Sequence, residues 1–288
     1  MSKTKFLKLH RGSALLLTLL LCGEPLFGTC ISVVILPAGI VMAADGKTIA
    51  YLANKRVPPK GVVSKKLRLL HRRMLLGAYG LAKIGDDPHP AYYLGSFFDR
   101  VEKEVSKTAT VSEVAQKIGE DATEAMSGIT QVLAGGTLTR DALIQQTGRD
   151  NPLAGFVIAG YEFGSPKLFR ITLEIDWSTG RLRPAIVALI YPPPPGMPQT
   201  NIFSSDTTNA SLIPSWTACR VPKGGIPLHN IEIMARAIVD LDIEINGANV
   251  GLPITTVTLL PDGGYRIARF QTRLPNLCEA QSQKKHGQ

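Results

Sequence analysis

The chain has 288 residues, of which 44% are hydrophobic and 19% charged, and its formal net charge is +9. This hydrophobic content suffices for a full core, and the length allows one large domain or two ordinary ones. A basic nucleic-acid surface usually interleaves aromatic residues with its positive charges. The most basic stretch, residues 55–73, contains no aromatic residue, so we expect no nucleic-acid partner.

Residues 1–28 have the pattern of a secretory leader. Lysines and an arginine precede an apolar run that ends at Cys22, Gly23-Glu24-Pro25 breaks this run, and Gly28 offers a small residue at a cut site. The run is shorter than the roughly 20 residues that cross a bilayer. We expect a cleaved leader and an exported protein, periplasmic or secreted. A propeptide removed by the protein itself and an uncleaved anchor, which would be the one tie to a membrane, remain open.

After the leader, the sequence predicts two hairpins, two helices, a strand pair, a third helix and a closing hairpin. Thr110 is a predicted N-cap, because Glu113 follows it by three residues. The expected strands are 30–36, 40–44, 66–70, 74–79, 153–161, 167–175, 255–260 and 265–271, and the expected helices are 91–107, 110–133 and 228–241.

This order lacks the strict alternation of strand and helix that is typical of a doubly wound parallel sheet. It favours an α+β fold, namely a four-layer αββα sandwich of two antiparallel sheets flanked by helices. We expect one domain over residues 29–275, with a Pro-rich insertion near 192–225 and a polar tail at 276–288.

The junction Gly28-Thr29 is the most informative feature of the chain. A cut after Gly28 would give Thr29 a free α-amino group, whose reference pKa is roughly 7.7–8.0. One residue would then carry both a hydroxyl nucleophile and a base that accepts its proton. Two short strands joined by a turn would bring Asp45 back beside Thr29.

These features resemble the proteasome β-type subunits, a branch of the N-terminal nucleophile hydrolases, and most of all the bacterial ATPase-partnered peptidase. The similarity covers residues 28 to 273, and it depends on the order and spacing of several short motifs. They are, in chain order, Gly28-Thr29, Asp45 sixteen residues after the threonine, Lys65-Lys66, Gly77-Ala78-Tyr79-Gly80, residues 159–169, residues 249–254 and residues 259–263.

The resemblance implies a role for each site residue. Thr29 would be the nucleophile, Lys66 would lower the pKa of its amine by like-charge repulsion, and Asp45 would hold Lys66. Backbone groups at Gly80 and Lys47 would bind the oxyanion and the substrate backbone. The resemblance further implies a peptide or amide substrate and a homo-oligomeric ring. The chain has no CxxC or His-rich spacing, so we expect no metal site, and we expect no other cofactor.

Several alternatives remain open at this stage. Cys30 is a rival nucleophile, and Lys66 could be a solvated strand end. The family's Gly-Ser-Gly step is not found, and its Asp-x-x-Ser pair is replaced by the segment that begins at Asp242. A catalytically inactive binding or scaffold subunit and a small-molecule amidase or acylase on the same fold therefore compete with a peptidase. In an exported protein Cys219 and Cys278 could pair, but spacing does not decide this.

Overall fold

The computed structural model describes residues 30–36, 38–46, 50–52, 55–57, 66–80, 83–84, 92–127, 139–141, 154–189, 199–204, 213–220, 228–245 and 251–276. The leader, the junction Gly28-Thr29, Lys47 and the tail beyond residue 276 lie outside the described residues.

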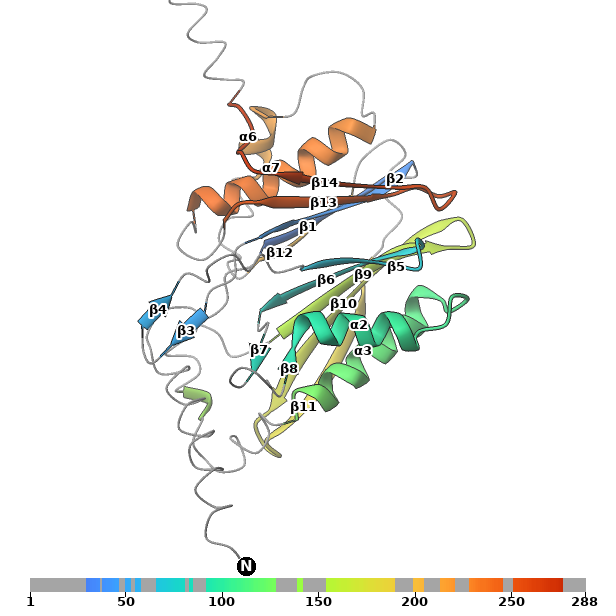
Figure 1. Cartoon of the computed structure of the whole chain (residues 1–288), viewed down its shortest axis with the longest axis vertical. Helices are drawn as coiled ribbons and strands as arrows, with labels where there is room; N and C mark the ends of the chain where they lie inside the picture. Colours follow the sequence, from blue (N-terminus) through green and yellow to red (C-terminus); the bar gives the residue numbers. More distant parts are fainter. Residues whose placement is uncertain are drawn as a thin grey trace, which may run out of the picture.

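Two five-stranded antiparallel sheets form the centre of the fold (Figure 1). The first sheet has the order β12 (Gln199–Ser204), β1 (Cys30–Leu36), β2 (Gly39–Asp45), β13 (Ile254–Leu259) and β14 (Tyr265–Phe270). The second has the order β11 (Arg181–Ala188), β10 (Ser165–Asp176), β9 (Ala154–Glu162), β6 (Met74–Gly80) and β5 (Leu67–Leu70). Two short pairs join β3 (Ala50–Leu52) to β4 (Lys55–Val57) and β7 (Lys83–Ile84) to β8 (Tyr92–Tyr93).

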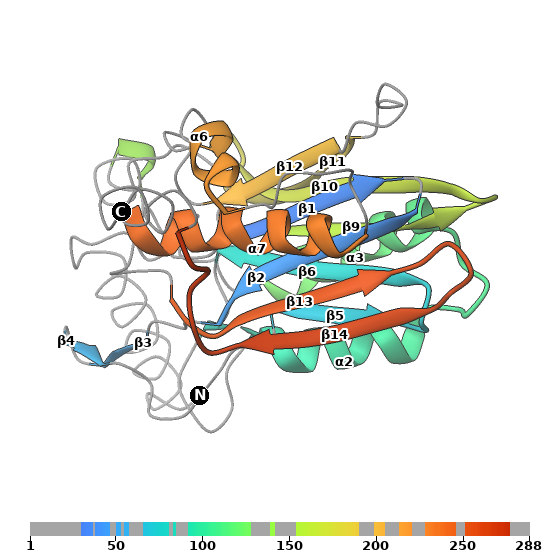
Figure 2. The same ribbon diagram turned by 90° about the horizontal axis from the view of Figure 1, so that it is seen from above.

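Helices cover the outer faces of both sheets. The long helix α7 (Leu228–Ile245) packs on the first sheet, while α2 (Leu94–Glu104) and α3 (Val111–Ala125) pack on the second (Figures 1 and 2). The short helix α6 (Ile213–Ala218) lies against α7. The predicted class is therefore confirmed: the fold is α+β, with two antiparallel sheets packed together and flanked by helices.

The strands β1 and β2 lie in the middle of this sandwich, and every residue in both is buried. Side chains alternate between the two faces of a strand, so both faces of these strands must be apolar. In β1, Ile31, Val33 and Ile35 pack between the sheets, whereas Val34 and Leu36 pack toward α7. This explains why the two strands appear in the sequence as continuous apolar runs.

The start of helix α3 follows a simple local rule, whereas its end differs from the prediction. The predicted capping box at α3 is present, because the Thr110 side chain accepts from the Glu113 N–H and the Thr110 N–H donates to the Glu113 carboxylate. Helix α3 ends at Ala125 and does not continue to residue 133 as expected; residues 128–133 lie outside the described residues.

Two strands of the main sheets, β11 and β12, were not expected from the sequence, and neither were the short pairs β3–β4 and β7–β8. Strand β12 lies within the segment 192–225, so this segment is not merely an insertion: it completes the first sheet by pairing with β1. Strand β11 contains Pro184, which removes a backbone donor and interrupts the apolar alternation. Proline is tolerated there because β11 is the edge strand of its sheet.

Candidate active site

The two charged side chains expected at the site meet between the two sheets. Asp45 is the last residue of β2 in the first sheet, and Lys66 directly precedes β5 in the second. The Lys66 ammonium donates to both carboxylate oxygens of Asp45, at 2.8 and 2.9 Å. Asp45 is 1% exposed and Lys66 5% exposed, so Lys66 is not a solvated strand end.

The same carboxylate also accepts backbone N–H groups. The Cys30 N–H donates to Asp45 Oδ1 at 3.0 Å, and the backbone of Gly251 forms a further hydrogen bond to this side chain. The nitrogen of Cys30 belongs to the peptide bond that joins it to Thr29. The Asp45–Lys66 pair therefore lies at the first described residue of β1, directly after the candidate nucleophile. Thr29 itself lies outside the described residues.

Burial dominates the electrostatics of Asp45. Removal from water raises the pKa of its carboxyl above the ordinary value of 3.8, although the Lys66 ammonium and the hydrogen bonds from Lys66, Cys30 and Gly251 act in the opposite direction. The carboxyl therefore takes up a proton at a higher pH than an exposed aspartate does.

This raised pKa predicts an unusual pH dependence of stability. The folded state binds the Asp45 proton more tightly than the unfolded state, so the stabilisation linked to this group is full below the unfolded pKa and is lost as pH rises through the folded pKa. We expect the free energy of unfolding of the wild type, minus that of Asp45→Asn, to fall as pH rises from below the ordinary value of 3.8 through the raised pKa of the folded state. Denaturant titrations across this range measure the difference, and a difference that grows with pH would contradict the assignment.

Gly80, the expected oxyanion donor, lies at the same end of the sandwich as Lys66. The Ala78 N–H donates to the Lys66 carbonyl at 3.0 Å, and Gly80 follows Ala78 by two residues at the end of β6. Gly80 has a φ of 85°, in the left-handed region that glycine adopts without steric cost. The structure thus brings Gly80, Lys66 and Asp45 to one end of the sheets.

The ring of Tyr79, next to Gly80, crosses the neighbouring strand at Gly155, its partner in register. A Cβ atom added at Gly155 would lie 2.1 Å from the tyrosine ring. We expect Gly155→Ala to lower the free energy of unfolding by about 1–3 kcal/mol through overpacking. Denaturant unfolding measures this loss. The same substitution in a Tyr79→Ala background should cost less, and an equal cost in both backgrounds would refute the contact as its cause.

Cys30, the rival nucleophile, is fully buried and its side chain is directed toward α7. Burial is the main cause that raises the pKa of its thiol, and the nearby carboxylates of Asp242 and Asp45 raise it further. A buried thiol that stays protonated is a weak nucleophile. The structure therefore favours a packing role for Cys30.

Asp242 is the residue that sequence analysis did not place at the site. It is 3% exposed, and its carboxylate forms a hydrogen bond with the Cys30 thiol. Ala235, Ile238 and Asp242 share one face of α7 at helical spacing, and the first two belong to the apolar contact with the first sheet. An acidic residue on this apolar face was the available signal for a buried polar site.

Gly28, Thr29 and Lys47 lie outside the described residues, so their predicted roles stay predictions. Within the described ranges, no group of three or more His, Cys, Asp or Glu side chains could hold a metal ion. In the same part of the chain, no helix is long and apolar enough to cross a membrane.

Comparison with families and with curated proteins found no relative of this chain. The chain matches no family model, and no curated protein is significantly similar to it. The residues of the site therefore carry the functional argument.

Proposed function

We propose that this chain is a threonine-type N-terminal nucleophile hydrolase, which cleaves peptide or amide bonds through an acyl-enzyme on Thr29. One observation carries the proposal. Asp45, which forms a buried ion pair with Lys66, also accepts a hydrogen bond from the N–H of the Thr29–Cys30 peptide bond. A buried ion pair is a poor source of stability, so its hydrogen bond to Cys30, the residue that follows Thr29 in the sequence, favours a catalytic use.

The chemistry begins with the cut after Gly28, which frees the Thr29 amine. The Thr29 hydroxyl adds to the substrate carbonyl while the amine, directly or through a water molecule, takes its proton. The Lys66 ammonium lowers the pKa of this amine by like-charge repulsion and so keeps it neutral and basic. Asp45 holds the Lys66 ammonium in place through its two hydrogen bonds.

The oxyanion that forms on the substrate needs a hydrogen-bond donor. The proposal assigns this role to the backbone N–H of Gly80, where one well-placed donor contributes about 3–4 kcal/mol to transition-state stabilisation. The leaving amine receives the proton held by the Thr29 amine, and an ester remains on Thr29. Water activated by the same amine then hydrolyses the ester, which releases the acid and restores the hydroxyl.

The cysteines support export as part of the proposal. Cys219 is disulfide-bonded, and its partner lies outside the described residues. Disulfides persist in oxidising compartments such as the periplasm or the extracellular space. The proposal therefore retains a leader over residues 1–28, while assembly into a homo-oligomeric ring rests on the family resemblance alone.

Acylation by a β-lactone tests the proposal. A nucleophilic hydroxyl opens the lactone ring, forms an ester with its carbonyl carbon, and leaves the former ring oxygen as a hydroxyl. We expect one acyl group per chain, mapped by peptide mass to Thr29, in the wild type and in Cys30→Ala. Labelling that moves to Cys30, or that persists in Thr29→Ala, would refute the assignment. An unlabelled chain that begins at Thr29 would instead favour an inactive binding subunit.

A further inference from the structure

The C-terminal end of α7 carries an unfavourable charge pattern. Asp240, Asp242 and Glu244 occupy the last two turns of the helix, and the last turn has no basic residue. The helix dipole is negative at this end, so carboxylates there are destabilising unless cations from elsewhere compensate them. Asp240 and Asp242 are both buried, which makes the need for compensation stronger.

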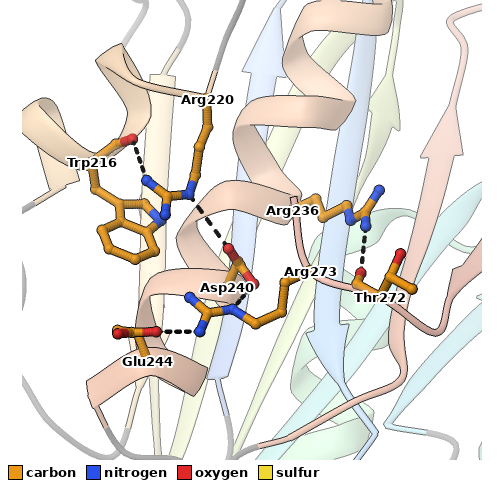
Figure 3. A network of polar contacts seen from close by, with 7 residues as sticks. All are labelled: Trp216, Arg220, Arg236, Asp240, Glu244, Thr272 and Arg273. Atoms are coloured by element: carbon orange, nitrogen blue, oxygen red, sulfur yellow. Dashed lines mark hydrogen bonds and ion pairs between the residues drawn. The ribbon is translucent and has the colours of Figure 1, made fainter. Parts of the chain in front are cut away.

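Two arginines from distant parts of the sequence supply the positive charge (Figure 3). Arg220, two residues after the end of α6, forms an ion pair with Asp240 at 3.5 Å. Arg273, after β14, donates to Asp240 at 2.8 Å and also pairs with Glu244. The side chain of Asp240 is 0% exposed and that of Arg220 is 7% exposed. Loss of either arginine would therefore leave buried negative charge poorly compensated.

Arg220 is held in place from both sides. Its guanidinium carbon lies 3.3 Å from the ring centroid of Trp216, and its Nη1 donates to the Trp216 carbonyl at 3.5 Å. On the other side it directly follows Cys219, which is disulfide-bonded and only partly exposed. The disulfide therefore restrains the residue next to Arg220, which together with Arg273 compensates the negative charge at the end of α7. We call Trp216, Cys219, Arg220 and Arg273 the α7 latch.

The latch connects to the candidate site through the helix backbone. Asp240, which the latch neutralises, is two residues from Asp242 on α7. The Asp242 carboxylate forms a hydrogen bond with the Cys30 thiol, and the Cys30 N–H donates to Asp45. A shift of the last two turns of α7 would therefore act directly on the first residue of β1.

We propose that the α7 latch is a redox-sensitive support of the hydrolase site. In the reduction step a dithiol gives two electrons and two protons to the Cys219 disulfide, so that Cys219 and its partner become thiols and the dithiol becomes a cyclic disulfide. Reduction frees α6, withdraws Arg220 from Asp240, and loosens Asp242 from Cys30. The effect on hydrolysis rests on the proposed function, but the loosening of α7 does not.

Alkylation of Cys30 gives a readout that is independent of hydrolysis. Full-length protein is kept oxidised, or is reduced with dithiothreitol that is then removed in degassed buffer. Each sample reacts with iodoacetamide, and the peptide that contains Cys30 is quantified by mass. Since Cys30 is buried behind Asp242, we expect reduction to raise its alkylation rate by about tenfold or more. The pH profile of this alkylation should also move to lower pH, because opening reduces both the burial and the contact with the Asp242 carboxylate that raise the pKa of the Cys30 thiol.

Two variants separate the latch from general loosening. Cys219→Ser and Arg220→Gln should raise Cys30 alkylation without added reductant. Lys117→Met, which removes the more exposed ion pairs of this α3 lysine with Glu104 of α2 and Asp121 of α3, should leave it unchanged. Hydrogen exchange in α3 checks that the opening is local. Equal Cys30 alkylation before and after reduction, or opening of α3 together with α7, would overturn the proposal.

The two proposals fail separately. Redox-dependent alkylation of Cys30 in a chain that hydrolyses no amide in either state would support the latch and refute the hydrolase. Amide hydrolysis together with Cys30 alkylation that does not depend on the redox state would support the hydrolase and refute the latch.

Discussion

Replacement of Thr29 by alanine is expected to lower amide hydrolysis by at least about 10⁴-fold, because the chain then has no hydroxyl to form the acyl-enzyme. The measurement is the steady-state hydrolysis of fluorogenic peptide amides by proteins that begin at residue 29. Folding should be unaffected, because the substitution removes only a hydroxyl and a methyl group.

Two matched variants sharpen this test. Thr29→Ser keeps both hydroxyl and amine and should retain measurable activity. Cys30→Ala should also retain it, since the thiol is buried and its pKa is raised. Wild-type activity in Thr29→Ala, or loss of activity only in Cys30→Ala, would show that a residue other than Thr29 is the nucleophile.

Replacement of Lys66 by methionine is expected to lower the free energy of unfolding by about 3–5 kcal/mol, since it leaves the Asp45 carboxylate buried without its cation. Denaturant unfolding at neutral pH measures this loss. The exposed fractions support a cost of this size, because the two side chains are 5% and 0% exposed.

A double variant separates stability from catalysis at this pair. Lys66→Met/Asp45→Asn removes both charges, while the amide oxygen of asparagine can still accept the Cys30 N–H. We expect it to regain a large part of the lost stability and none of the activity. Lys117→Met, at a partly exposed pair, should cost no more than about 1 kcal/mol. If Lys66→Met is as stable as the wild type, this contradicts the claim that Asp45 and Lys66 form a buried ion pair.

Much of the fold could be predicted because local patterns decide it. Strands β1 and β2 are covered on both faces, so they appear as uninterrupted apolar runs, and the capping box at Thr110 marks the start of α3. Strands β11 and β12 could not be predicted in this way. Pro184 breaks the pattern of the first, and the second lies in a Pro-rich segment whose pairing with β1 is set by tertiary structure.

The candidate site likewise contains residues that could be predicted and residues that could not. Asp45 and Lys66 were expected together only through the family resemblance, and the structure confirms that they are in contact. Asp242 and the α7 latch were missed because their meaning depends on contacts between distant segments. No local pattern indicates that Arg220 and Arg273 lie on either side of Asp240.

The mass of the mature protein tests the central claim most directly, because the proposed chemistry requires a free amine on Thr29. Intact mass and N-terminal sequencing of wild type and Thr29→Ala give the first residue of each. We predict that the wild type begins at Thr29, and that loss of the cut in Thr29→Ala would identify the protein as its own processing enzyme. A wild-type chain that begins at any other residue would leave Thr29 without its base and would contradict the proposed function.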